Sequence, residues 1–291
     1  MKIKIIIIVT AMSVISSGIF SSCNKDDDGI YNPKKKISKI YTQYDNGNKQ
    51  LDEIWTWNKN QLSKIEYNAY SSVFEYEKNQ ISKITDNDGD YQKFTYNGSK
   101  ISKIEYFSDY KLWIVFNFEH SKGKISKITI EENSNYGKHD LNFLKSKKNN
   151  ALRLILPEQI AEKTVKANLK NQKIFGKYSE INKYTYTYTW KGDNVEQLVV
   201  EAICNGEVYT NTHKYTYDNK INPMYGLFIG KQFSLSKNNV IKSTETDSDN
   251  NYFKYECSYV YNDYFPTEIK YTYSIGVHID IYTITKYYEY E

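Results

Sequence analysis

Histidine and cysteine are scarce in this chain, which limits the chemistry it can perform. It has four histidines and three cysteines in 291 residues. None of the histidines lies at a metal-ligand spacing, and the sequence lacks a nucleophile motif such as Gly-x-Ser-x-Gly. Carboxylates are plentiful, but any two could meet across strands, so a glycosidase pair is neither excluded nor located. We expect no metal, no cofactor and no enzymatic activity.

An excess of charge of one sign is also lacking. The formal net charge is +4, with 39 basic and 35 acidic residues, and this near balance argues against a nucleic-acid partner. The mean hydropathy is −0.71, and only Leu112–Phe118 comes close to a continuous apolar strand, so a lipid-facing belt is not expected. Tyrosine is abundant instead, with 30 copies. Tyr and Thr favour strands with one packed face and one wet face.

The start of the chain has the pattern of an export signal. Residues 1–22 combine a basic start, an apolar run over Ile5–Phe20 and two serines directly before Cys23, the order of a secretory signal peptide. A cysteine after two small residues is the acceptor site of a bacterial lipoprotein, so we expect lipid on Cys23. The alternatives are a plain cleaved signal and an uncleaved anchor helix. The run is shorter than the roughly 20 residues that a spanning helix needs, which disfavours the anchor.

Residues 23–33 form an acidic tether behind the lipidated cysteine. Lys25 is followed by Asp26, Asp27 and Asp28. This segment resembles the export signal of surface lipoproteins in Bacteroidota-type bacteria. The resemblance implies an outer-membrane lipoprotein exposed at the cell surface. The other interpretation is that the three aspartates only make a solvated tether.

Residues 34–291 form a repeat array that we expect to fold as a single domain. Ser-Lys-Ile recurs five times, each copy preceded by Ile or Leu, at Ser38–Ile40, Ser63–Ile65, Ser82–Ile84, Ser102–Ile104 and Ser126–Ile128. A period of roughly 20 residues fits one β-hairpin. Asn-Gly and Asp-Gly pairs between the copies are turn signals. The alternation of aromatic and polar residues indicates half-buried antiparallel strands.

The second half continues the strand pattern with two interruptions, and the later one, Asn222–Gly226, is expected to be a loop. Further strands are expected at Leu198–Cys204, Val208–Tyr217, Val240–Thr246, Tyr252–Tyr261, Glu268–Tyr273 and His278–Tyr290. Pro157 suits a helix start, and Ala161, Val165 and Leu169 are spaced four apart. We therefore predict one short helix from Pro157 to about Lys170 in the middle of an all-β antiparallel meander.

Three motifs carry a resemblance to a known family: Tyr215–Lys220, Asn222–Gly226 and Pro266–Tyr273. With the hairpin repeats they resemble an uncharacterised family of Bacteroidota lipoproteins, a domain of unknown function with a porin-like fold. The resemblance covers nearly all of the mature chain. It implies a large sheet curled into an open or closed porin-like barrel, and it implies no activity. A weaker similarity is to the tyrosine-aspartate (YD/Rhs-like) repeats of large secreted shell proteins.

Aromatic residues are the remaining candidates for a binding site. Two sets each share one face of a predicted strand: Trp55 and Trp57, and Tyr184, Tyr186, Tyr188 and Trp190. Such faces stack on sugar rings and anchor protein interfaces, but alternating tyrosines also fill the core of a wide sheet. The preferred hypothesis is a non-catalytic binding module for a glycan, peptide or host component. The alternative is a structural or accessory envelope protein that acts by contacting another membrane protein.

The two remaining cysteines leave a disulfide open. Cys204 and Cys257 could pair in an oxidising envelope if their strands adjoin. A small packed thiol on the face that Cys257 shares with Tyr255 and Tyr259 is the other interpretation.

Overall fold

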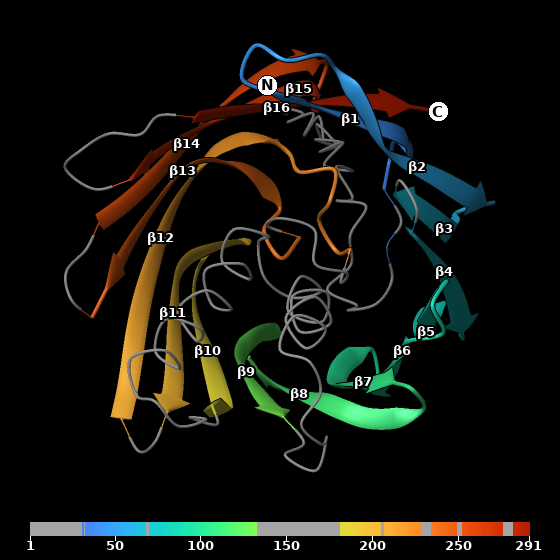
Figure 1. Cartoon of the computed structure of the whole chain (residues 1–291), viewed down its shortest axis with the longest axis vertical. Helices are drawn as coiled ribbons and strands as arrows, with labels where there is room; N and C mark the ends of the chain where they lie inside the picture. Colours follow the sequence, from blue (N-terminus) through green and yellow to red (C-terminus); the bar gives the residue numbers. More distant parts are fainter. Residues whose placement is uncertain are drawn as a thin grey trace, which may run out of the picture.

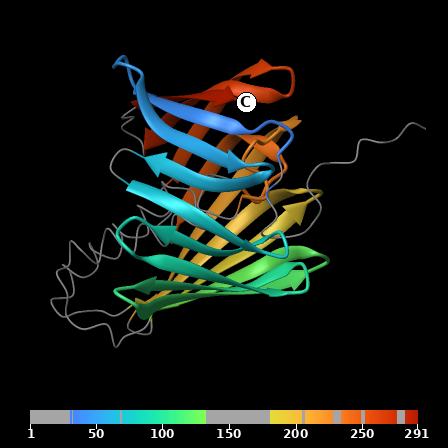
Figure 2. The same cartoon turned by 90° about the vertical axis from the view of Figure 1, so that its right-hand side faces the viewer.

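Every element that the structure describes is a β-strand. The computed structural model describes residues 31, 33–67, 70–132, 181–204, 207–227, 234–248, 252–275 and 282–291. Each strand pairs antiparallel with its neighbours in the sequence, and β1 pairs with β16, so the sheet closes into a barrel (Figure 1). Figure 2 shows the strands crossing the barrel wall obliquely, which is the tilt that closure requires.

The sixteen strands fall within the repeat array that the sequence predicts. They are β1 (Ile37–Tyr44), β2 (Gln50–Asn58), β3 (Gln61–Tyr67), β4 (Tyr70–Glu77), β5 (Gln80–Asp86), β6 (Tyr91–Asn97), β7 (Lys100–Ser108), β8 (Lys111–Ser121), β9 (Lys124–Glu132), β10 (Ile181–Lys191), β11 (Asn194–Cys204), β12 (Glu207–Ile221), β13 (Asn238–Asp247), β14 (Tyr252–Asn262), β15 (Phe265–Ile275) and β16 (Tyr282–Tyr290).

The predicted fold class needs a correction. The sequence left the sheet open or closed and added a helix, whereas the described residues form a closed barrel of strands without a helix. The helix expected from Pro157 to about Lys170 lies outside the described residues. Closure has a physical reason: β1 and β16 would otherwise be edges with unpaired backbone groups, and pairing them removes both edges. Within the described residues, no helix has the length and apolar character needed to cross a membrane.

The Ile-Ser-Lys-Ile repeat forms a β-bulge near the start of a strand. Across β6 and β7, Thr95 pairs with Lys103 and Tyr96 with Ile101, so Ser102 is an extra residue. A regular strand would place residues three apart on opposite faces. The bulge instead turns Ile101 and Ile104 to the same side, where both are fully buried. The Ser102 hydroxyl donates to the Thr95 carbonyl at 3.1 Å.

The same bulge recurs in every odd-numbered strand. The extra residues are Ser38, Ser63, Ser82, Ser102, Ser126, Glu196, Ile241 and Thr267. All eight lie towards one end of the barrel, where the odd-numbered strands begin, and we call this end the bulge rim. The opposite end is the far rim. Bulges bend and twist their strands, so a ring of eight helps the long sheet to curl closed.

Aromatic side chains from the even-numbered strands complete the bulges. The Tyr76 hydroxyl donates to the carbonyl of Leu62, the residue before a bulge, at 2.8 Å. The equivalent bonds join Trp57 to Ile37, Tyr96 to Ile81, Trp190 to Ile125, Tyr217 to Val195, Tyr259 to Val240 and Tyr290 to Pro266. An aromatic ring with one polar tip can pack inside the barrel and still satisfy a backbone carbonyl. Five of the 30 tyrosines have this role.

The barrel keeps its apolar core inside and most of its charges outside. Inward-facing residues such as Ile65, Ile104 and Tyr184 are fully buried. Ion pairs cover the outer wall, including Lys64–Glu66 at 2.6 Å, Lys83–Glu75 at 3.3 Å, Lys103–Glu105 at 3.0 Å, Lys127–Glu119 at 3.1 Å and Lys254–Glu256 at 2.7 Å. A lysine facing lipid at the bilayer midplane costs about 2–4 kcal/mol. The described outer wall therefore carries charges that contact with lipid would disfavour.

Candidate functional site

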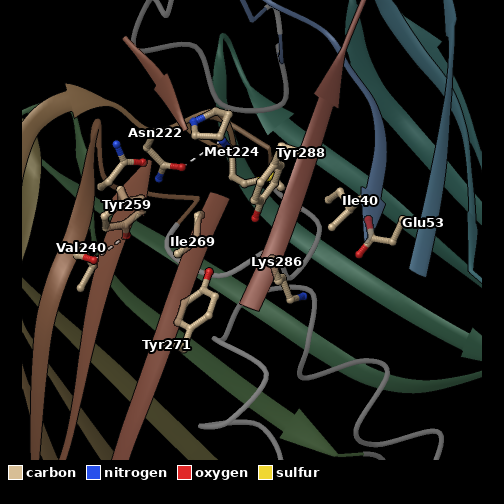
Figure 3. A pocket seen from close by; sticks show the side chains of 12 residues that line it. Ile40, Glu53, Asn222, Met224, Val240, Tyr259, Ile269, Tyr271, Lys286 and Tyr288 are labelled. Carbon is tan, nitrogen blue, oxygen red and sulfur yellow. Dashed lines mark hydrogen bonds between the residues drawn. The ribbon is translucent and has the colours of Figure 1, made fainter. Parts of the chain in front are cut away.

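A small polar cavity lies inside the barrel beside the closing seam of β1 and β16. Its wall comes from β1, β2, β13, β14, β15, β16 and the loop that starts at Asn222, and its volume is about 40 Å³. In Figure 3, Tyr271, Lys286 and Tyr288 project from β15 and β16 towards it, and Ile40 and Glu53 line the other side. This volume holds one or two water molecules. Ligand pockets for larger molecules measure about 300–1,000 Å³.

One acidic residue, Glu53, lines the cavity beside an irregularity in β2. Ile40 pairs with Glu53 and Tyr41 with Leu51, so Asp52 is an extra residue in the register. Glu53 is only 5% exposed, and its Oε2 accepts a hydrogen bond from Trp55 Nε1 at 2.7 Å. A buried carboxylate is costly unless hydrogen bonds compensate for its lost hydration. The indole N–H supplies part of that compensation.

A lysine from the last strand contributes the opposite charge. Lys286 Nζ lies 3.9 Å from Asp52 Oδ2, and the same carboxylate oxygen accepts from Thr42 Oγ1 at 2.7 Å. Thr42 pairs with Lys286 in the ladder between β1 and β16. Closure of the barrel therefore brings acids of the first hairpin and an amine of the last strand to one place.

Two phenols complete the cavity. Tyr271 and Tyr288 are buried. Burial raises the pKa of Tyr288 to about 12, against the opposing effects of the Lys286 charge and a hydrogen bond from Tyr271. Burial also raises the pKa of Tyr271 well above its ordinary value. Both phenols are therefore protonated at neutral pH and can act as hydrogen-bond donors, but they are poor general bases.

The Asn222–Gly226 motif forms the loop that borders the cavity, as the sequence predicts. Asn222 Oδ1 accepts from the Met224 amide and its Nδ2 donates to the Ser236 carbonyl, both at 2.9 Å. Met224 is buried, and Tyr31 donates its hydroxyl hydrogen to the Pro223 carbonyl. The loop is thus held from both sides by buried polar contacts.

The six aromatic residues proposed from the sequence all face the barrel interior. The least exposed are Tyr184, Tyr186, Trp55 and Tyr188, with 0%, 0%, 4% and 8% exposure. Trp57 and Trp190 are partly buried and donate to bulge carbonyls. This placement agrees with core packing, the alternative that the sequence left open, and a stacking role stays a prediction. Cys23, Lys25, Asp26, Asp27 and Asp28 lie outside the described residues.

Other candidate groups are also accounted for. His213 Nδ1 lies 4.0 Å from Glu245 Oε2, and among the described residues no group of three His, Cys, Asp or Glu side chains could hold a metal ion. Cys257 is a buried free thiol whose pKa burial raises to about 12. Its strand, β14, is separated from β11, the strand of Cys204, by two strands. Cys257 is therefore not in the disulfide that the sequence left open.

Sequence reasoning missed Glu53 and Lys286, although a signal was present. Glu53 shares the alternating face of Trp55 and Trp57, and Lys286 shares the face of Tyr288 and Tyr290. A charged residue that alternation places on the same strand face as aromatic residues must be either buried with partners or at a strand end. Such residues are candidates for an interior polar site.

The fold has a counterpart among solved structures. A porin-like protein from Bacteroides uniformis is 12% identical, and the alignment covers 88% of this chain and 96% of that chain with a TM-score of 0.52. TcdB2-TccC3 aligns at 13% identity over 87% of this chain and 15% of that chain, but its TM-score of 0.30 is too low to support an argument. No protein-family model and no curated protein matches the chain. The first similarity establishes a porin-like barrel fold.

Proposed function

We propose that this chain is a non-catalytic binding module, displayed on the outer membrane as a lipoprotein of the Bacteroidota type. In this proposal, lipid on Cys23 anchors the protein, and the segment with Lys25 and three aspartates directs it to the cell surface. The barrel captures a glycan, peptide or host component. The described cavity beside the seam is too small for such a ligand, so we assign capture to another surface.

The exposed aromatic residues of the far rim carry the proposal. Tyr44, Tyr70 and Tyr110 are 63%, 62% and 86% exposed, and Tyr252 is 49% exposed. They lie at the far-rim ends of β1, β4 and β14 and in the turn between β7 and β8. Tyrosine supplies a large, rigid contact area with a polar tip, which suits both sugar rings and peptides. The far rim is therefore the surface that we assign to capture.

Replacing Tyr110 with alanine should weaken ligand binding about tenfold or more, as expected for an aromatic anchor. The matched control is Tyr264→Ala, because Tyr264 is also exposed but lies in a bulge-rim turn. A glycan array, followed by a peptide array, identifies the ligand, and titration of the two variants measures the loss. Equal losses in both variants, or no ligand on either array, would contradict capture by the far rim.

Replacing Asp26, Asp27 and Asp28 with alanine should move the protein from the cell surface to the inner leaflet. Protease shaving of intact cells measures the change, and lysed cells show that total protein is unaltered. If the wild-type protein resists shaving in intact cells, surface display is wrong.

The alternative function is an accessory envelope protein that contacts another membrane protein. Ile203 and Val208 pair directly across β11 and β12 near the far rim, and both are exposed, at 41% and 57%. An exposed apolar pair of this kind suits a protein interface. Cross-linking in cells to one reproducible partner, in the absence of any glycan or peptide ligand, would favour this function.

A further inference from the structure

We propose that the barrel stands upright on the membrane, with the bulge rim against anionic, phosphate-bearing lipid headgroups and the far rim pointing away. The proposal rests on the lipid anchor of the proposed function and adds a second membrane contact to it. It also explains how the far-rim tyrosines would be kept available for a ligand.

The chain enters the barrel at the bulge rim. Tyr31 is buried there, with its ring centroid 5.7 Å from that of Trp57, and β1 begins nearby at Ile37. The stretch from Cys23 to Tyr31 spans at most about 28 Å when fully extended. An anchor on Cys23 would therefore hold the bulge rim close to the bilayer surface.

The bulge rim is rich in exposed lysines. Five of them lie in its turns, just before β1 or at the end of β10: Lys34, Lys59, Lys78, Lys122 and Lys191. Each lysine near an anionic membrane surface contributes an attraction of about 1 kcal/mol. Several lysines on one rim therefore make a sizeable electrostatic contact.

Several acidic side chains of this rim already form ion pairs or hydrogen bonds. Asp193 pairs with Lys124 at 2.9 Å and with Lys237 at 3.3 Å. Glu291 lies 3.9 Å from Lys36, and Asp218 accepts a hydrogen bond from Tyr261. The other exposed acids in the described part of this rim are Glu77 at the end of β4, Glu196 at a bulge and Asp263 in a turn. The five exposed lysines outnumber them, so the rim presents positive charge.

The described turns of the far rim have the opposite character. They expose Asp45, Asp88 and Asp109, and Asp247 ends β13 at the same rim. Among the described residues of this rim, Lys49 and Lys111 are exposed, and Lys183 lies 4.0 Å from Glu131. Several lysines of the outer wall pair with glutamates, which weakens the attraction of a barrel lying on its side. Among the described residues, the bulge rim is therefore the surface that best fits anionic headgroups.

An aromatic residue at the bulge rim supports the same orientation. Tyr264 is 59% exposed in the turn between β14 and β15, and Lys220 Nζ lies 4.8 Å from its ring centroid. Tyrosine and lysine side chains at one level are typical of a membrane–water interface. Tyr264 therefore marks the depth to which this rim would reach the headgroups.

Vesicle binding without the lipid tests the proposal. The chain from residue 23 onward, carrying Cys23→Ala, contains all sixteen described strands. We expect it to sediment with vesicles of phosphatidylcholine and phosphatidylglycerol but not with phosphatidylcholine alone, and to be released by salt. Neutralising the rim by Lys59→Gln, Lys78→Gln and Lys122→Gln together should weaken binding about 100-fold, since 1.4 kcal/mol corresponds to tenfold.

A second triple variant serves as the charge-matched control. Lys111→Gln, Lys214→Gln and Lys270→Gln remove the same charge from exposed positions on the far rim and outer wall, and should change binding less than threefold. Unchanged melting temperatures confirm that both variants fold. Equal losses in the two variants, or equal binding to both kinds of vesicle, would overturn the proposal. The lipid anchor is tested separately, by fatty-acid labelling of wild type and Cys23→Ala in cells, so its failure is visible independently.

Discussion

Raising the pH above 10 should unfold the barrel cooperatively, by about pH 11. Burial raises the pKa of thirteen buried or partly buried tyrosines: Tyr31, Tyr67, Tyr76, Tyr106, Tyr188, Tyr215, Tyr217, Tyr255, Tyr259, Tyr261, Tyr271, Tyr288 and Tyr290. A group whose folded pKa lies above its unfolded value stabilises the fold fully below the unfolded pKa. That stability is lost as the pH rises from the unfolded towards the folded value. For these tyrosines the loss of stability begins at about pH 10, the ordinary pKa of tyrosine in the unfolded chain.

The size of the effect follows from the number of tyrosines. One pH unit above the unfolded pKa, each buried phenol favours the unfolded chain by about 1.4 kcal/mol. Several such contributions outweigh a typical unfolding free energy of about 5–15 kcal/mol. Tyrosinate absorbance and far-ultraviolet circular dichroism, followed in one titration, should change together at the same pH.

Two substitutions sharpen this test. Tyr188→Phe removes a buried phenol whose pKa is raised by burial alone, so it should move the alkaline midpoint upward. Tyr110→Phe removes an exposed phenol and should leave the midpoint in place. If all tyrosines ionise near pH 10 while the β-sheet signal persists, the interior is accessible to water and the packed-core description fails.

Replacing Glu53 with alanine should cost about 2–4 kcal/mol of unfolding free energy. Trp55 Nε1 donates to this buried carboxylate at 2.7 Å, and a hydrogen bond to a charged group contributes about 1.5–3 kcal/mol. Alanine also enlarges the cavity, which removes packing contacts. Urea denaturation of the purified mature chain measures the loss.

The controls for Glu53 separate the hydrogen bond from the charge. Glu53→Gln keeps the shape and an acceptor for the indole, so it should retain more than half of the stability that alanine removes. Glu75→Ala breaks an outer-wall ion pair with Lys83 and should cost at most about 1 kcal/mol. A loss for Glu53→Ala no larger than that for Glu75→Ala would show that the cavity carboxylate is not a stabilising partner.

The Ile-Ser-Lys-Ile repeat illustrates the reach of sequence reasoning. Its spacing predicts hairpins, and the strands appear where the repeats stand. The bulge could not be inferred from one strand, because it depends on which residue of the neighbouring strand faces the serine. The pairing of Tyr96 with Ile101 and of Thr95 with Lys103 decides it, and these contacts belong to the sheet.

In the candidate site, too, some features follow from the local sequence and others depend on contacts between distant strands. Alternation places Trp55 and Trp57 on one strand face, but a strand alone does not tell which face is inside a closed barrel. Once β1 pairs with β16, that face becomes the interior, and aromatic residues proposed as a stacking surface become core. Glu53 and Lys286 stand at opposite ends of the chain, and closure of the barrel brings them to one cavity.

The sequence alone determined that this chain makes antiparallel hairpins with one solvent-exposed face and one packed face. The alternation of side chains and the turn residues that specify such hairpins involve only a few neighbouring positions. Closure of the sheet, the inward direction of the aromatic faces, the ring of bulges and the buried acid–lysine cavity were decided only by the tertiary structure. They depend on contacts between segments far apart in the chain, above all the seam between β1 and β16, and no local pattern encodes a partner at that distance.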